Sequence, residues 1–361
     1  MSRSWASEEL IKHQEERLRS LSTSGLGRRR IARRIEEATG RRCSDGVVGN
    51  ALGMLGIHKP RGICSPIPIT EPDPPEDYEA PIEELVESRI KAYRRKSNKS
   101  KFHERTLEFP CEPFGILLHG DPHLDDDGCD FDALVRYLEL AQETEGLFGA
   151  TVGDALNLWI GRLAKKYADS SLLASDGWRL TEWFIKSHSA GFLAFVFGNH
   201  DSWAAGQGVD PMAELCKKSG VIIHAPDEIR ITFRWKDRPE VEPIVWVLRH
   251  DFSGRSLFHP THGPHREALF DGKAHLFSAG HIHQWGELTT EQRHGRVSTA
   301  LRVRGYKRCD DYAKQKGFYE QQHGYACVIV IDPRSEGPGR LKIFWDVEQG
   351  CDYLTYVRGL L

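Results

Sequence analysis

The chain carries five short apolar runs, and residues with imidazole, carboxylate or amide side chains follow each run within a few positions. The runs cover residues 114–118, 147–152, 192–197, 244–248 and 274–277. Apolar runs of this length are typical of strands that are buried on both faces of a sheet. Because the strands of a layered α/β sheet present functional residues at their carboxyl ends, we expect these polar residues to meet in one site.

The polar residues form five motifs in a fixed order along the chain. They are Asp121-Pro122-His123, Gly153-Asp154, Gly198-Asn199-His200-Asp201, the single His250, and Gly280-His281-Ile282-His283. Their carboxylates, amide oxygen and imidazoles are a mixed ligand set that suits two divalent metal ions, manganese first, with iron, zinc or magnesium as alternatives. Since two such ions activate water and neutralise phosphoryl oxygens, the motifs predict hydrolysis of phosphoesters.

In this order the motifs resemble the pattern of the calcineurin-like metallophosphoesterase superfamily, D-x-H, G-D, G-N-H-D/E, H and G-H-x-H. The resemblance covers roughly residues 112–350 and implies a four-layer α/β/β/α sandwich. It also implies one metal ion on Asp121, His123 and His283, a second on Asn199, His250 and His281, and a bridging role for Asp154. Arg249 stands directly before His250, where the family often has glycine.

The third motif supplies the candidate acid. The resemblance places His200 just outside the metals, beside the leaving-group oxygen. An imidazole titrates near neutral pH, which suits protonation of a departing alkoxide. We expect Asp201 to orient the His200 ring from behind, as carboxylates commonly do in such sites. The alternative for both residues is a capped turn after a strand.

The candidate substrate contacts follow the second motif and a later strand. The second motif continues to Asn157 and Trp159 without the G-D-x-V-D-R-G sequence of protein Ser/Thr phosphatases. Both residues resemble positions in phage-encoded phosphoesterases, as do Gly305-Tyr306-Lys307 and Asp311-Tyr312-Ala313. A later strand ends in Arg302, Arg304, Tyr306 and Lys307, which either hold a second phosphate or a nucleotide base or keep a sheet edge polar. The candidate substrate contacts are Asn157, Trp159, Arg302, Arg304, Tyr306 and Lys307. Trp178, Trp183 and Trp203 either stack on bases or belong to the core.

The first sixty residues predict a small helical domain. They carry twelve Lys or Arg residues against seven Asp or Glu residues. Residues 28–35 have helical spacing, Gly40 supplies a break, and Ser44 is a plausible N-cap for a helix from Asp45 to Met54. With an earlier helix, residues 1–59 resemble small helix-turn-helix modules of bacterial and phage regulators.

This domain is a candidate for binding DNA. The helix from Asp45 to Met54 would enter the major groove, where only Asn50 suits the reading of a base. Phosphates would contact the arginines Arg28, Arg29, Arg30, Arg33, Arg34, Arg41 and Arg42. The alternative is a solvated basic face on a protein-interaction domain, and we favour DNA because of the local charge.

The rest of the chain divides into a linker, a connector and a catalytic domain. Residues 60–81 contain seven prolines among acidic residues, which predicts an extended tether. Residues 82–111 predict a basic helical connector, and residues 112–361 the catalytic domain. No apolar run approaches the roughly 20 residues that span a bilayer, and the polar start lacks a signal-peptide pattern, so we expect a cytoplasmic protein without a membrane partner. The eight cysteines are scattered, which predicts free thiols.

Together these patterns predict a metal-dependent phosphodiesterase that acts on nucleic acid and carries a DNA-binding module. A first alternative is a small-molecule phosphoesterase for nucleotides or cyclic nucleotides, whose N-terminal module recruits other partners. A second alternative is a DNA-binding regulator with a purely structural phosphoesterase domain. The complete ligand set argues against the second, because a structural remnant need not keep His200 beside the ligands.

Overall fold

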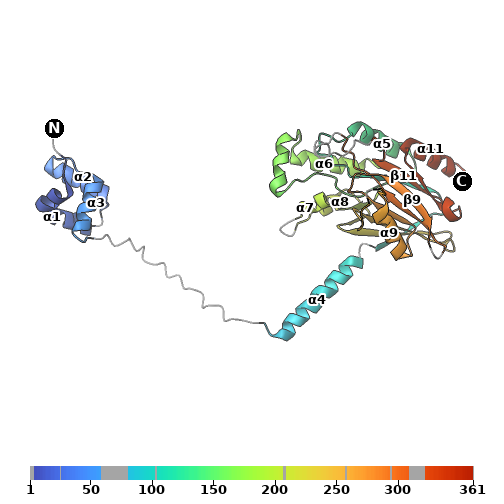
Figure 1. Cartoon of the computed structure of the whole chain (residues 1–361), viewed down its shortest axis with the longest axis horizontal. Helices are drawn as coiled ribbons and strands as arrows, with labels where there is room; N and C mark the ends of the chain where they lie inside the picture. Colours follow the sequence, from blue (N-terminus) through green and yellow to red (C-terminus); the bar gives the residue numbers. More distant parts are fainter. Residues whose placement is uncertain are drawn as a thin grey trace. The chain divides into compact units, whose positions relative to one another are not determined.

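The computed structural model describes residues 4–24, 26–57, 80–101, 104–205, 209–256, 258–292, 295–308 and 322–360. They belong to two compact units that divide after Leu85 (Figure 1). The Asp311-Tyr312-Ala313 segment and most of the predicted linker, residues 60–79, lie outside the described residues.

Among the described residues 4–24 and 26–57 of the first unit there are three helices: α1 Ser7–Thr23, α2 Arg28–Thr39 and α3 Asp45–Met54. Their buried apolar side chains form one cluster that includes Leu10, Leu18 and Ile31. Gly40 follows α2 with a φ of 67°, a left-handed conformation that glycine adopts without steric cost. The Ser44 side chain accepts a hydrogen bond from the Val47 amide at 3.3 Å, which confirms the predicted N-cap of α3.

The second unit is built on two six-stranded sheets with the orders β1-β6-β7-β8-β10-β9 and β12-β11-β2-β3-β4-β5. In the first sheet β7, β8 and β10 run parallel, and in the second sheet β2, β3, β4 and β5 do. The strands are β1 Glu104–Phe109, β2 Phe114–His119, β3 Leu147–Thr151, β4 Phe192–Val196, β5 Ile223–Ala225, β6 Glu228–Trp235, β7 Ile244–Arg249, β8 Leu276–Ala279, β9 Gly286–Glu291, β10 Val297–Arg302, β11 Ala326–Ile331 and β12 Leu341–Phe344.

The sheets are stacked, and helices cover their outer faces. In Figure 1, α5 and α11 lie on one side of the sheets and α9 on the other. Apolar side chains of α5, α6, α8 and α11 share one cluster with the second sheet, whereas α9 packs on the first sheet. A third cluster fills the space between the sheets. This order confirms the predicted four layers; the helices are α5 Phe131–Glu143, α6 Ala174–Lys186, α7 Asn199–Trp203, α8 Pro211–Lys218, α9 His262–Asp271 and α11 Val347–Arg358, with short 3-10 helices η1 Gly161–Asp169 and η2 Gly337–Arg340.

The segment that was expected to form a helical connector contains two different elements. Its first part is helical, as α4 Ile82–Lys101. Its second part forms β1, an edge strand that pairs in parallel with β6. Leu107 and Phe109 alternate with charged residues in β1, and the Phe109 ring stacks on Phe114 at 4.4 Å between centroids. The alternation of period two is the sequence signal of a half-buried strand, and the abundant charge of the segment obscures it.

The described helices and cysteines test two further expectations. None of the helices in the described part of the chain combines the length and the apolar character that a membrane crossing requires. The described cysteines are free thiols, as their scattered positions predicted: Cys43, Cys111, Cys129, Cys216, Cys327 and Cys351.

Candidate metal centre

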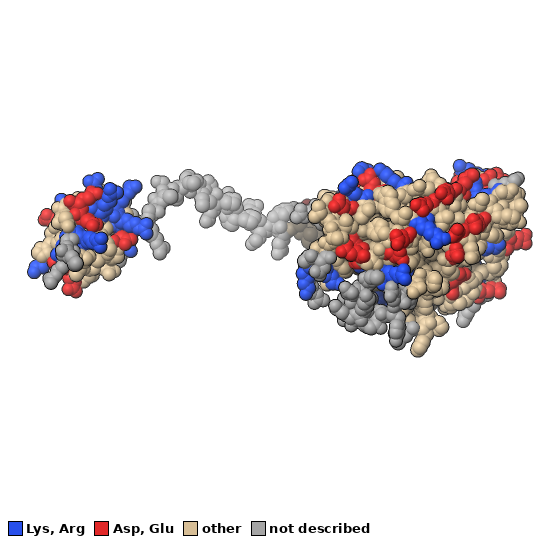
Figure 2. All heavy atoms as spheres, turned by 90° about the horizontal axis from the view of Figure 1, so that it is seen from above, with Lys and Arg blue, Asp and Glu red and all other residues tan. Residues whose placement is uncertain are grey.

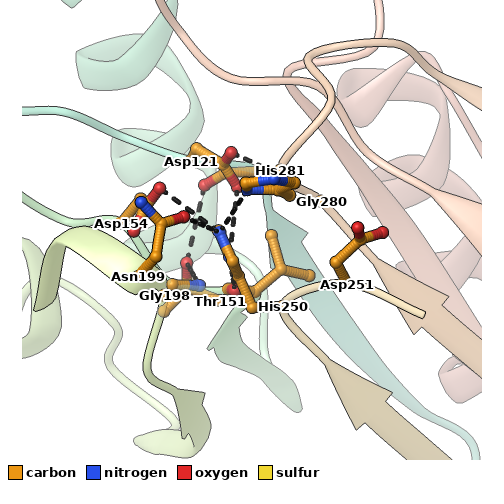
Figure 3. A network of polar contacts seen from close by, with 12 residues as sticks. Asp121, Thr151, Asp154, Gly198, Asn199, His250, Asp251, Gly280 and His281 are labelled. Atoms are coloured by element: carbon orange, nitrogen blue, oxygen red, sulfur yellow. Dashed lines mark hydrogen bonds and ion pairs between the residues drawn. The ribbon is translucent and has the colours of Figure 1, made fainter. Parts of the chain in front are cut away.

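The five sequence motifs meet at the carboxyl ends of strands from both sheets. Asp121 and His123 follow β2, Asp154 follows β3, and Asn199 begins α7 after β4. The first sheet supplies the remaining candidates, since His250 follows β7 and the last motif, His281 to His283, follows β8. Figure 3 shows residues of all five motifs turned toward one another. The polar residues that follow the five apolar runs therefore lie together in one site (Figure 3), as the sequence predicted.

The first ligand group consists of Asp121, His123 and His283. One ligand atom from each residue lies within 4.8 Å of the other two. The Nε2 atom of His283 is 3.2 Å from a carboxylate oxygen of Asp121. Asp121 Oδ1 and His123 Nδ1 are buried, and neither atom has a hydrogen-bond partner among the described residues. Buried polar atoms normally have partners, so two such atoms in one ligand group fit a bound cation.

The second ligand group consists of Asp154, His250 and His281. His250 Nδ1 lies 2.8 Å from the Val152 carbonyl, so this nitrogen carries a proton and donates it. Nε2 of the same ring faces Asn199 Oδ1 at 3.1 Å, His281 Nδ1 at 3.0 Å and Asp154 Oδ2 at 3.3 Å. Two imidazoles, a carboxylate and an amide oxygen that converge on one point are the arrangement expected around a metal ion.

The electrostatics of the second ligand group also favour a bound cation. Burial lowers the pKa of His250, but the nearby carboxylates of Asp154 and Asp121 outweigh burial and raise that pKa to about 10. Burial lowers the pKa of His123 and of His281. The two carboxylates therefore attract positive charge to a place where the other rings remain neutral. A divalent cation would supply that charge, and its binding would displace the proton of His250.

The backbone of the candidate ligands is strained. Outside glycine, positive φ angles occur at five positions in the described parts of the chain, and all five lie in or beside the site. Such left-handed conformations cost on the order of 1–3 kcal/mol each and cluster at functional sites. Four belong to candidate ligands: His123 at 46°, Asp154 at 51°, His281 at 70° and His283 at 49°, with Leu158 at 42° beside them.

The departure from the family pattern at Arg249 leaves His250 in place. The Arg249 guanidinium pairs with Glu228 on the neighbouring strand at 2.6 Å. Adjacent residues of a strand point to opposite faces, so this arginine turns away while His250 turns into the site.

His200 lies beside the ligand groups with its orientation fixed. Its backbone amide donates to the Asp154 carboxylate at 2.9 Å, and its Nδ1 donates to the backbone carbonyl of Asn157. The other ring nitrogen, Nε2, faces Asp154 at 4.0 Å. Burial lowers the pKa of His200. The ring is therefore held with Nε2 toward the ligands, the orientation that a candidate acid requires.

Asp201 does not touch the His200 ring, which corrects the expectation that it orients this ring. Its carboxylate instead accepts hydrogen bonds from the backbone amides of Asp154 at 2.7 Å, Gly198 at 2.9 Å and Ala155 at 3.0 Å. Asp201 thereby ties the second motif to the third. A side chain at Gly198 would collide with the Asp154 carboxylate, which explains the glycine at this position.

Two of the predicted substrate contacts instead support the site. Lys307 is buried, and its ammonium group donates to Asn157 Oδ1 at 2.7 Å and pairs with Asp126 at 2.9 Å. The Asn157 amide nitrogen donates to the same Asp126 carboxylate at 2.9 Å. Because the Asn157 carbonyl accepts from His200, this network positions the candidate acid.

Tyr306 and Arg304 are buried, contrary to the expectation that they contact a substrate. The Tyr306 hydroxyl lies 2.7 Å from Nδ1 of His119, and its ring stacks on Tyr325 in the core. Arg304 donates to the backbone carbonyl of Lys307 at 3.0 Å. Both side chains hold the loop that follows β10. Of the predicted contacts, Trp159 remains half-exposed beside the site.

Arg302 supports the loops that carry His250 and His281, a role that the sequence motifs did not indicate. It is buried at the end of β10 and donates to Asp251 at 2.8 Å, to the Pro260 carbonyl at 2.7 Å and to the Gly280 carbonyl. Asp251 follows His250, and Gly280 precedes His281, so one guanidinium holds the loops of both histidines. The sequence signal was an arginine at the end of an apolar strand, which is compatible equally with a substrate contact.

The candidate nucleic-acid contacts lie in the first unit. Arg41 is an exception to the expectation, because it pairs with Glu9 at 2.6 Å and lies 4.3 Å from the centroid of the Trp5 ring. This arginine fastens α1 to the loop before α3. Figure 2 shows Lys and Arg side chains gathered on the visible face of this unit. The other candidates are exposed: Arg28, Arg29, Arg30, Arg33, Arg34, Arg42 and, on α3, Asn50.

No family model matches the chain, and no curated protein matches its sequence. Similar solved structures include a 5'-nucleotidase precursor from Thermus thermophilus, with a TM-score of 0.35, 10% identity and coverage of 69% of this chain and 58% of that chain. A Vps29 variant from Entamoeba histolytica has a TM-score of 0.34, 10% identity and coverage of 64% and 97%. The calcineurin-like phosphoesterase YfkN from Bacillus subtilis has a TM-score of 0.30, 13% identity and coverage of 68% and 99%. These low scores carry no information about the substrate of this chain.

Proposed function

We propose that the chain is a calcineurin-like metallophosphoesterase that hydrolyses phosphodiester bonds in nucleic acid. The observation that carries this proposal is the meeting of two ligand groups, one around Asp121 and one around Asp154, at the strand ends of two stacked sheets. His200 stands beside them with its orientation fixed by Asn157. A set of this composition fits two divalent cations, for which manganese is our first choice.

In the proposed reaction Asp121, His123 and His283 would hold one metal ion, and Asp154 would be shared with a second ion held by Asn199, His250 and His281. When bound, such a pair activates water and neutralises phosphoryl oxygens. The residues of the chain supply the remaining parts. His200 keeps its Nδ1 proton on the Asn157 carbonyl. Because burial lowers the pKa of this ring, Nε2 would first take up a proton from solvent and would then give it to the departing oxygen. Asp201 keeps the Asp154 loop against α7 through three backbone amides.

We assign the first unit to nucleic-acid binding. The exposed arginines of α2 would contact phosphates, because guanidinium groups suit phosphate oxygens in both charge and geometry. Two of these arginines take part in surface ion pairs, Arg29 with Asp45 at 3.4 Å and Arg33 with Glu37 at 3.0 Å. Exposed pairs of this kind contribute little energy, so a phosphate competes with them easily.

The test is a parallel assay of the purified full-length protein with manganese. Single- and double-stranded DNA, cyclic nucleotides and bis-p-nitrophenyl phosphate are the substrates, and the Asp154→Asn variant is the control. We expect cleavage of DNA and of the small diester, with both activities lost in the variant. Cleavage of cyclic nucleotides without DNA would favour a small-molecule phosphoesterase. Absence of every activity with metals bound would favour the structural alternative.

The contribution of the first unit is tested separately. The triple variant Arg29→Gln, Arg30→Gln, Arg33→Gln should weaken DNA binding and flatten its salt dependence, because fewer counterions are released. Its rate on bis-p-nitrophenyl phosphate should match that of the unmodified protein. An unchanged affinity for DNA would instead make this unit a site for protein partners.

A further inference from the structure

Two tryptophan side chains pack beside His200. Trp159 comes from the loop after β3, and its ring centroid is 5.0 Å from that of His200. Trp203 is the last residue of α7, and its centroid is 4.2 Å from that of His200. The two indoles are 6.4 Å apart, and both are half-exposed. We call them the tryptophan pair.

Positive charge adjoins the tryptophan pair. The ammonium group of Lys166, on η1, lies 4.7 Å from the centroid of the Trp159 ring. The ammonium group of Lys307 lies 5.2 Å from the same ring, but this lysine is buried and paired with Asp126, so it does not attract a nucleic-acid backbone. Lys165, next to Lys166, is exposed to solvent. Aromatic surface bordered by lysines is the combination that binds single-stranded nucleic acid, because bases stack on the rings while the cations attract the backbone.

We propose that the tryptophan pair binds the nucleobase of the leaving nucleoside. This inference rests on the proposed function, in which His200 faces the departing oxygen. If that oxygen belongs to a sugar, the attached base lies within reach of rings that contact His200. Every base has a flat face, so stacking recognises a nucleoside without selecting its sequence. The two indoles thus favour a nucleoside as the leaving group at the proposed site.

The origin of the two rings supports this assignment. Trp159 follows Asp154 by five positions, and Trp203 follows His200 by three on the same helix. Residues three apart on a helix share a face, so Trp203 and the candidate acid are presented together. Any displacement of α7 would therefore move the ligand Asn199, the acid and the Trp203 ring as one body.

The test compares two substrates that share a leaving hydroxyl and differ only in the base. One is a dinucleotide, and the other is the same molecule with an abasic sugar at the leaving position. We expect the full-length protein with manganese to have a lower KM for the dinucleotide by about 5- to 100-fold, the range that one stacked base supports. In Trp159→Ala and Trp203→Ala this preference should shrink toward one. Trp183→Ala, which removes a partly exposed indole from α6, is the matched control and should keep it.

The outcomes separate this inference from the proposed function. If the unmodified protein hydrolyses neither substrate, the proposed function fails. If it hydrolyses both equally well, the phosphodiesterase assignment stands and the nucleobase site is wrong. If the tryptophan variants lose the same activity on both substrates, the indoles only pack against His200. This result also overturns the inference.

A binding measurement gives a readout that is independent of turnover. Nucleoside monophosphates should quench the tryptophan fluorescence of the metal-free protein, and the quenching should weaken in Trp159→Ala far more than in Trp183→Ala. Equal titrations in both variants would contradict the assignment.

Discussion

Two histidine pairs of this protein have the same contact distance and opposite chemistry. In the core, His119 Nε2 lies 3.0 Å from His188 Nε2. In the candidate metal centre, His250 Nε2 lies 3.0 Å from His281 Nδ1. A distance alone therefore does not distinguish a structural pair from a pair of ligands. The groups around each pair do.

The core pair is a completed chain of hydrogen bonds. The Tyr306 hydroxyl donates to His119 Nδ1, His119 Nε2 donates to His188 Nε2, and His188 Nδ1 donates to the Phe184 carbonyl at 3.1 Å. Each proton has one acceptor. No carboxylate is among these partners, and burial lowers the pKa of both rings, that of His188 to about 4. Both rings therefore stay neutral at neutral pH, and nothing in this chain of hydrogen bonds calls for a cation.

The second pair lacks such a chain. His250 donates its Nδ1 proton to the Val152 carbonyl, and its Nε2 meets a carboxylate, an amide oxygen and another ring nitrogen. A metal ion would satisfy these groups together, in place of the proton that the carboxylates of Asp154 and Asp121 hold on His250. The comparison shows that carboxylate and amide oxygens turn a histidine pair into a ligand set.

Removal of the carboxylate should have the largest effect. In Asp154→Asn the second pair loses the charge that attracts a cation, so we expect activity to fall by about 1,000-fold or more. Metal retained after dialysis, measured by mass spectrometry, should drop below two ions per chain. Asp352→Asn on the exposed face of α11 is the control. Full activity with two bound ions would remove the two-metal proposal.

Removal of His200 should separate catalysis from metal binding. We expect His200→Ala to keep both metal ions and to lose about 100- to 10,000-fold in kcat, the range of general acid catalysis. The loss should grow as the leaving group becomes more basic, because such groups depend more on a donated proton. Release of a metal ion from this variant would make His200 a ligand instead.

Removal of Arg302, which holds the loops of His250 and His281, should lower metal affinity by an intermediate amount. Arg302→Met frees Asp251 and Gly280, the neighbours of His250 and His281, and we expect metal affinity to fall by about 10- to 100-fold. Arg230→Met is the matched control, since Arg230 lies on β6 of the same sheet as Arg302 and pairs with Asp271 at the end of α9. Competition with a coloured chelator measures both. Equal affinities in the two variants would show that Arg302 only stabilises the fold.

Breaking the core pair should change stability and leave chemistry untouched. His188→Leu removes the acceptor of the His119 Nε2 proton, which costs about 1–3 kcal/mol of unfolding free energy. Metal content and rate should not change. Denaturant unfolding followed by circular dichroism measures the difference, and a lost metal ion in this variant would contradict the separation of the two pairs.

The same variant has a pH signature. The pKa of His188 is about 4 in the folded chain and about 6.5 in an unfolded one, so the unfolded chain takes up the proton first. The stability of the unmodified protein should therefore fall as pH drops from about 6.5 to about 4. The free energy of unfolding of His188→Leu should fall less over this pH range. A parallel loss in both proteins would assign the acid sensitivity to other groups.

The sequence predicted the candidate metal ligands better than it predicted the residues that hold these ligands in place. Apolar runs placed the strands, and the motif after each run, such as Asp121 or His250, reached the common site. The roles of Asp201 and Tyr306 were missed because their partners are distant in sequence: Tyr306 meets His119 across 187 residues. Local patterns carry no information about such contacts. The strand β1 was missed because its alternation is short and lies within a charged segment.

The left-handed backbone of four candidate ligands limits which sequences can occupy these positions. Asparagine and aspartate reach this conformation at least cost among residues with a side chain, whereas β-branched residues reach it only with strain. Exchange at His123, His281 or His283 is thus easiest toward Asn or Asp, both of which still offer an oxygen ligand. The loops therefore admit gradual drift from imidazole to oxygen ligands, and with it a change of preferred metal, while the fold is retained.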